Sequence, residues 1–233
     1  MEEKSLALSF GNSLTEEVAD CVGEFAELGL DSIMEEGLLK DIPFISTAIS
    51  IYRIGNTIHD RQYVKKLAIF IDEINKSVAD ETRLKVYREK FHNNDKFRCK
   101  ELEFVMVLID RYIGLEKPRM FAKLYLAYLD KKITWILFSE YAEILDRLLS
   151  SDIECLFLFM CRGGVTTVDD KDVSVESVLR LSAVGFVEQV ARMTWGEATG
   201  EMNKRQKITD YGRVFAEICA IEMGSNRRKE MMP

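Results

Sequence analysis

The apolar positions are densest between Asp41 and Lys76, and we expect the helical part of the protein to be organised around this stretch. From Ile42 to Ile58 nearly every residue is apolar, and the polar exceptions recur at helical spacing: Ser46, Ser50, Arg53 and Thr57. A helix that is apolar around most of its circumference is buried in protein or in membrane, and a bilayer span needs about 20 apolar residues. We therefore predict a central core helix with Asp41 as its N-cap and Pro43 in its first turn. A membrane-inserting hairpin is the alternative.

After Asn56 the apolar residues continue on only one face of a predicted helix. That face comprises Tyr63, Val64, Leu67, Phe70, Ile71 and Ile74. The other faces carry Arg61, Lys65, Lys66, Asp72, Glu73 and Lys76. The segment is therefore predicted to be a surface helix that lays one apolar stripe on the core. Together the two segments predict one buried core that contains Ile45, Ile49, Tyr52, Leu67, Phe70 and Ile71.

Further helices are predicted before and after this stretch. Ser13 and Glu16 fit a capping box, so the first helix is expected from Leu14 to about Glu35. Helical spacing of apolar residues predicts others at 77–91, 97–112, 118–128 and 134–148, the last one capped by Thr134.

After Ser151 short strands alternate with helices. The expected order is a helix over 152–161, a strand at 165–168, a helix over 174–184 capped by Ser174, strands at 186–194 and 207–209, and a closing helix over 210–222. Gly163-Gly164 and Gly185 are expected to end the helices that precede them. The chain is thus predicted to be mainly α, with a helical bundle at residues 1–150 and a small α+β module at residues 151–233.

Two phrases in the last third of the chain resemble winged-helix proteins: VESVLRLSAVGFVEQV at 175–190 and KITDYGRVFAEI at 207–218. In that family a helix that ends in a leucine-rich turn and Gly leads into the first wing strand. An Ile-Thr-x-x-Gly phrase leads from the second wing strand into the last helix. The whole layout also resembles small uncharacterised bacterial proteins associated with abortive infection or defence. These resemblances imply a winged-helix-like module at 151–233 and a setting in phage defence.

Composition and charge refine this interpretation. With 47% hydrophobic and 30% charged residues, the chain has enough apolar side chains for a sizeable core. The acidic N-terminus lacks the cationic start of a signal peptide, and five scattered cysteines fit free thiols, so we expect a cytoplasmic protein. The net charge of -7 conceals a basic region, because residues 53–132 carry 18 Lys or Arg against 12 Asp or Glu, a balance of +6. Either the acidic N-terminal part neutralises this region internally, or its basic face meets an acidic partner.

Motifs that carry chemistry are missing from the sequence. Neither His59 nor His92 has a Cys or His at the spacing of zinc ligands. The glycine-rich phosphate loops and the G-x-S-x-G elbow do not occur. We therefore expect no catalytic residues, no metal and no cofactor, and the sequence indicates no small-molecule ligand.

The remaining candidates are cationic residues of the C-terminal module that could contact nucleic acid or a partner: Arg180, Lys204, Arg205, Lys207 and Arg213. DNA affinity depends mostly on such residues, yet residues 151–233 carry 11 bases against 13 acids, so we expect weak nucleic-acid binding. The leading hypothesis is a non-enzymatic protein that binds a protein partner or itself. One alternative is a winged-helix DNA-binding transcriptional regulator. Another is a membrane-acting effector that releases residues 41–58 but stays off the membrane at rest.

Overall fold

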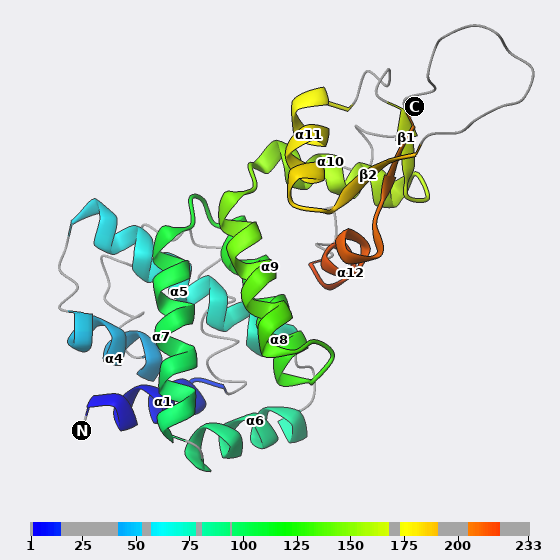
Figure 1. The fold of residues 1–233 in the computed structure, drawn as a ribbon. Helices are drawn as coiled ribbons and strands as arrows, with labels where there is room; N and C mark the ends of the chain where they lie inside the picture. The colour runs from blue at the N-terminus through cyan, green and yellow to red at the C-terminus, as the bar shows by residue number, and fades with distance from the viewer. Residues whose placement is uncertain are drawn as a thin grey trace, which may run out of the picture. The chain divides into compact units, whose positions relative to one another are not determined.

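The computed structural model describes residues 2–14, 42–52, 57–77, 81–93, 95–167, 173–190 and 205–219. Within these ranges the protein is mainly helical, with ten helices and one three-stranded antiparallel sheet (Figure 1). This confirms the predicted mainly α class and the small amount of strand near the C-terminus. The chain divides into two compact units, Met1–Ala142 and Glu143–Pro233, with the boundary inside helix α9 (Trp135–Arg147).

The first unit contains α1 (Glu2–Asn12), α4 (Pro43–Tyr52), α5 (Ile58–Ser77), α6 (Glu81–Asn93), α7 (Asp95–Arg111), α8 (Glu116–Leu129) and the first part of α9. Helices α6 to α9 match the predicted segments closely. Thr134 caps α9 as expected, because its Oγ1 accepts a hydrogen bond from the Leu137 N–H at 3.2 Å. Helix α1 was not predicted, since its one apolar stripe is short and no capping signal precedes it. Beyond Leu14, the predicted helix from Leu14 to about Glu35 lies outside the described residues.

Helix α5 is buried on more than one face. The six residues predicted on its inward face are all buried, as expected. Lys65, Lys66 and Asp72 are buried as well, so the prediction of a surface helix is wrong. The reason is that α5 packs against α4, α7 and α8, and these neighbours cover more than one of its faces.

Lys66 shows how a charged residue is accommodated in this position. Its Nζ donates hydrogen bonds to the carbonyl oxygens of Asp110, at 2.5 Å, and Tyr112, at 3.0 Å. Both carbonyls lie at the C-terminal end of α7, where carbonyl oxygens have no N–H partner within the helix. Burial lowers the pKa of Lys66, and the negative charge of Asp110 opposes that shift. A side chain of α5 thus stabilises the end of α7.

Helix α4 has a buried side and an exposed side. Phe44, Ile45 and Ala48 are buried, whereas the predicted polar residues Ser46 and Ser50 are exposed. Pro43 opens the helix as expected. Of the predicted core residues, Ile45, Leu67, Phe70 and Ile71 are buried and Ile49 is half-buried, while the Tyr52 side chain lies outside the described part. The predicted N-cap Asp41 and the polar residue Arg53 also lie outside it.

Ser13 connects three helices of the first unit. Its buried Oγ accepts a hydrogen bond from the Phe44 N–H in the first turn of α4, at 2.9 Å. The same hydroxyl donates to the Ser9 carbonyl of α1, at 2.9 Å. The Ser13 carbonyl accepts from Asn75 Nδ2 of α5, at 3.0 Å. One residue therefore satisfies buried polar groups at the points where α1, α4 and α5 meet.

Aromatic rings fill the interior of the same unit. The Phe10 ring of α1 lies 5.0 Å from that of Phe44 and 4.6 Å from that of Phe91, both edge-to-face. The Phe70 ring of α5 lies 5.6 Å from that of Phe121, which in turn stacks on Phe138 at 5.5 Å. Such pairs add to the stabilisation from burial alone, so α1, α5, α8 and α9 share one aromatic core.

The second unit contains α10 (Ser150–Cys161), β1 (Val165–Thr167), α11 (Val175–Ala183), β2 (Val187–Val190), β3 (Arg205–Ile208) and α12 (Asp210–Ile218). The strand order is β1-β3-β2, with Val165 opposite Lys207 and Val187 opposite Ile208. Helix α10 packs against α11, α12 and the sheet. Gly164 and Gly185 have φ angles of 87° and 78°, the left-handed conformation expected where a helix ends. Among the described residues no helix combines the length and apolar character that crossing a membrane requires.

Candidate functional site

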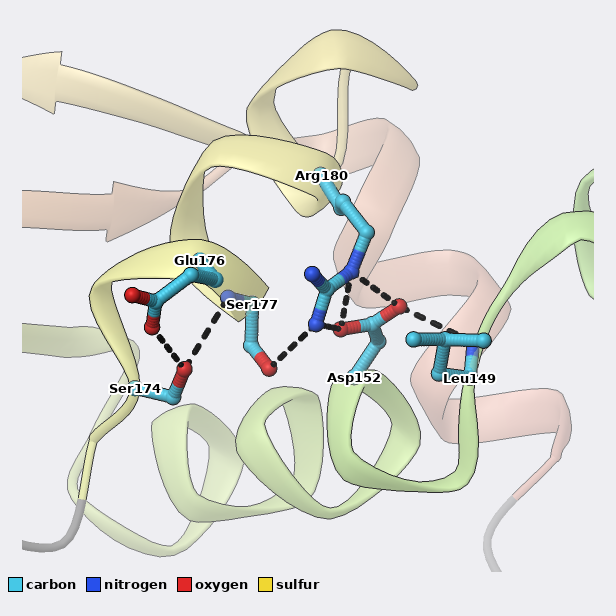
Figure 2. Close-up of polar contacts among 6 residues, drawn as sticks. All are labelled: Leu149, Asp152, Ser174, Glu176, Ser177 and Arg180. Atoms are coloured by element: carbon cyan, nitrogen blue, oxygen red, sulfur yellow. Dashed lines mark hydrogen bonds and ion pairs between the residues drawn. The ribbon is translucent and has the colours of Figure 1, made fainter.

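Arg180, one of the C-terminal residues singled out from the sequence, belongs to a polar cluster between α10 and α11 (Figure 2). Arg180 of α11 points toward the first turn of α10, where the Asp152 carboxylate is fully buried. The Arg180 Nε donates to both Asp152 oxygens at 2.9 and 3.0 Å, and Nη2 donates to Oδ1 at 2.7 Å. Nη2 also donates to Ser177 Oγ at 3.2 Å. The guanidinium is therefore engaged within the unit.

Asp152 holds two elements at once. Its Oδ2 accepts a hydrogen bond from the Leu149 N–H at 2.9 Å, which satisfies a free donor at the start of α10. Burial by itself would raise the pKa of Asp152, but the hydrogen bonds from Arg180, Leu149 and Ser177 lower it below the ordinary value. The hydrogen bond to Asp152 in turn raises the pKa of Arg180. Both groups are ionised at neutral pH and satisfy each other.

The start of α11 is organised as the sequence predicted. Ser174 is the N-cap, and its Oγ accepts a hydrogen bond from the Ser177 N–H at 3.3 Å. The same hydroxyl donates to Glu176 Oε2 at 2.7 Å, and this bond lowers the pKa of Glu176. The exposed Glu176 thus places a fixed negative charge on the first turn of α11 (Figure 2).

The Ile-Thr-x-x-Gly phrase joins β2, β3 and α12. Thr209 caps α12, because its Oγ1 accepts from the Gly212 N–H at 3.0 Å, and the hydroxyl donates to the Gly185 carbonyl at 2.7 Å. A Cβ on Gly212 would lie 2.4 Å from the Phe186 carbonyl oxygen. Glycine is therefore required here by the close approach of α12 to the start of β2.

The outer face of α11 is apolar. Val178 and Leu181 point inward and are buried, whereas Val175 and Leu179 are 45% and 65% exposed. Val175, Leu179 and the exposed Ala183 follow one another at intervals of four, so they lie along one side of the helix. We call these three residues the α11 outer stripe.

The other predicted contact residues are placed differently. Arg205 and Lys207 are exposed on one face of β3 and alternate with the buried Gln206 and Ile208. Arg213 is half-buried, and its guanidinium lies against Gly164, where an added Cβ would come within 2.7 Å of Nη2. Lys204 lies outside the described residues. The structure thus brings Arg205 and Lys207 together at the surface and holds Arg180 against α10.

Sequence reasoning missed Asp152 as the partner of Arg180. The available signal was its position three residues after Leu149, where a carboxylate reaches back to the N-cap N–H. That position was interpreted only as the beginning of a short apolar helix. Pairing with a residue 28 positions later depends on the packing of α10 against α11, which the sequence alone does not reveal.

The described residues also contain no group of three or more His, Cys, Asp or Glu side chains that could hold a metal ion. Burial raises the pKa of the Cys155 thiol to about 11, so this cysteine is a thiol at neutral pH. Comparison of the chain with protein-family models, with curated proteins and with solved structures finds no match.

Proposed function

We propose that the second unit is a winged-helix-like module that binds a protein partner through the α11 outer stripe. The order α10-β1-α11-β2-β3-α12 and the antiparallel sheet β1-β3-β2 support the winged-helix-like assignment. Phage defence is the proposed setting, and it rests only on the resemblance described above. The first unit would provide a second contact surface or a means of self-association.

The single observation that carries the proposal is the chemistry of α11. A helix that reads DNA offers cationic and amide side chains to phosphates and base edges. Here the basic residue of the helix, Arg180, is held by Asp152, and the exposed side chains include Val175 and Leu179. An apolar stripe on an exposed helix suits a protein partner.

The stripe and its flank also define the partner's chemistry. Glu176 stands beside the stripe as an exposed carboxylate. We therefore infer an amphipathic partner segment, with apolar side chains on Val175 and Leu179 and a basic side chain facing Glu176. A second copy of this chain is the alternative occupant, which a mass measurement identifies.

The test compares the unmodified protein with Leu179→Asp as bait in a host lysate, followed by titration of the purified partner. Val214→Asp is the matched control, because Val214 is an exposed apolar residue of a helix in the same unit, α12. We expect Leu179→Asp to weaken partner binding at least about tenfold, the scale of losing one well-packed apolar contact. Equal binding by Leu179→Asp, or equal loss in the control, overturns the proposal. Light scattering of the same proteins shows whether the partner is a second copy.

DNA binding is the second candidate, favoured by the exposure of Arg205 and Lys207 on one face of β3. We expect only salt-sensitive, sequence-independent binding, weaker than the roughly 10⁻⁸ M of a specific regulator. In fluorescence anisotropy with duplex from upstream of the gene, Lys207→Gln should reduce the salt slope by about 1 if Lys207 contacts a phosphate. Tight, sequence-selective binding that Arg180→Ala abolishes would instead favour the regulator.

A membrane-acting effector would have to release the apolar side of α4. That side is packed into the first unit through Phe44, Ile45 and Ala48. In addition, the Phe44 N–H of α4 donates a hydrogen bond to Ser13 Oγ. We therefore expect no flotation of the purified protein with liposomes in the absence of an activator. Robust co-flotation would favour the effector.

A further inference from the structure

The first unit carries a surface hollow of about 230 Å³ between α6 and the C-terminal end of α8. Its walls include three cationic side chains, Arg83, Lys90 and Lys131, and one carboxylate, Asp130. The formal charge of this set is +2, from three cations and one anion. Val86 and Tyr87 add apolar and aromatic surface to the same walls. None of these residues belongs to the surface for which a partner was proposed above.

The cations are only partly neutralised. Arg83 Nη2 donates to both oxygens of Asp130 at 2.9 and 2.8 Å, and Tyr87 donates its hydroxyl proton to the same carboxylate. Lys90 Nζ donates to the Leu129 carbonyl at 3.0 Å, and no carboxylate of the described residues forms an ion pair with it. Among the described residues, the Lys131 ammonium group has no ion-pair partner. Asp130 therefore compensates one cation of the hollow and leaves two.

The electrostatics of Lys90 reflect this excess. Burial lowers the pKa of Lys90, and the positive charges of Arg98 and Lys131 lower it further, against the opposing effect of Asp130. An anion in the hollow would reverse that repulsion. The hollow is thus better suited to a negatively charged ligand than to a neutral one.

The backbone at Lys131 provides a second indication. Its φ angle is 61°, a left-handed conformation at the end of α8 where glycine is the usual residue. The Lys131 N–H donates to the Tyr128 carbonyl at 2.9 Å, as the ending of a helix requires. The backbone of any residue with a Cβ is strained in this conformation. The bond that ends the helix is made by the Lys131 backbone, so it does not require the lysine side chain. Strain of this kind, retained in a concave cationic site, points to a role for the side chain.

We propose that this hollow binds the phosphate group of a small phosphate monoester. The phosphate would lie between Lys90 and Lys131, with a remaining N–H of Arg83 as a further donor. The carrier of the phosphate would pack on the exposed side chain of Val86. A volume of about 230 Å³ is smaller than the roughly 300–1,000 Å³ of drug-sized sites, so the carrier is about the size of a sugar.

The test is isothermal titration of the full chain with ribose 5-phosphate, with inorganic phosphate and ribose as separate arms. Lys131→Gln should weaken ribose 5-phosphate binding about tenfold, since a hydrogen bond to a charged group is lost. Lys85→Gln is the control, because Lys85 is an exposed lysine of α6, the helix that carries Arg83 and Lys90, and does not line the hollow. The control should change affinity by less than about twofold.

Two further variants separate the charge of the site from the integrity of the fold. Lys131→Gly should raise the melting temperature, because glycine fits the positive φ, and still weaken binding as Lys131→Gln does. Asp130→Asn should tighten binding about threefold or more, since it removes a like charge and releases Arg83. Circular dichroism verifies that each variant is folded.

The proposal fails if ribose 5-phosphate does not bind at millimolar concentration, or if Lys85→Gln weakens binding as much as Lys131→Gln. Tighter binding of inorganic phosphate than of ribose 5-phosphate would exclude the carrier contact. If Asp130→Asn does not fold, the comparison of Lys131→Gly with Lys85→Gln decides the matter alone.

Discussion

Arg180 and Asp152 connect α11 to α10 through three hydrogen bonds to one fully buried carboxylate. Removing the two partners should have unequal effects. Arg180→Ala leaves a buried carboxylate without its cation, whereas Asp152→Asn leaves a partly exposed arginine that can turn to water. We expect Arg180→Ala to lower the free energy of unfolding more than Asp152→Asn, measured by urea denaturation. The double variant should lose less than the two single losses combined; additive losses would show that the pair is not coupled.

The same pair makes stability depend on pH. Because the folded pKa of Asp152 is below its ordinary value of 3.8, its ionised form stabilises the fold. This contribution is fully present above the ordinary pKa and is lost as the pH falls through the lower, folded value. The stability difference between the unmodified protein and Asp152→Asn should therefore be constant near neutral pH and shrink below about pH 4. Urea denaturation of both proteins from pH 3 to 7 measures it; a difference that grew in acid would contradict the assignment.

Gly212 should not tolerate even one added methyl group. Gly212→Ala places a Cβ against the Phe186 carbonyl, and backbone atoms cannot move aside as a flexible side chain would. We expect a loss of about 3 kcal/mol or more in the free energy of unfolding. Val214→Ala, an exposed change in the same helix, should cost less than about 0.5 kcal/mol. Similar effects of the two changes would refute the close approach.

Ser13→Ala tests the connection between α1 and α4. The change leaves the buried Phe44 N–H without its acceptor, while the bond from Asn75 to the Ser13 carbonyl remains. The expected loss is about 1–3 kcal/mol. Ser46→Ala, an exposed change in α4, is the control and should be nearly neutral.

Phe70 tests the aromatic core. Its side chain is fully buried and its ring lies 5.6 Å from that of Phe121. Phe70→Ala should cost about 3–5 kcal/mol through lost burial and the cavity that remains. Ile113→Ala, at a strongly exposed position, should leave the melting temperature unchanged. An unchanged melting temperature in Phe70→Ala would remove Phe70 from the core.

Much of the local structure could be predicted from the sequence. Thr134 and Ser174 were identified as caps because a cap acts within one helical turn, and Gly185 as a helix end because glycine accepts a positive φ. The degree of burial of α5 was underestimated because periodicity reports one apolar face and cannot count how many neighbouring helices surround a segment. Lys65, Lys66 and Asp72 therefore looked like surface residues.

The candidate sites were harder to predict because they depend on contacts between distant segments. Arg180 was predicted to contact nucleic acid or a partner, whereas its guanidinium is held by a side chain from a helix earlier in the chain. The hollow beside Lys131 brings α6 together with the end of α8, and no spacing along the sequence relates Arg83 to Asp130. Charge counting located the basic region without identifying where its cations converge.

The burial of Lys66 has a chemical consequence. Acylating reagents attack the neutral form of a lysine amine, and here that amine is enclosed and donates to two carbonyl oxygens. Although its lowered pKa would favour the neutral form, the reagent can reach the nitrogen only when the end of α7 separates from α5. The labelling rate of Lys66, followed by mass spectrometry, would therefore report how often the interior of the first unit opens.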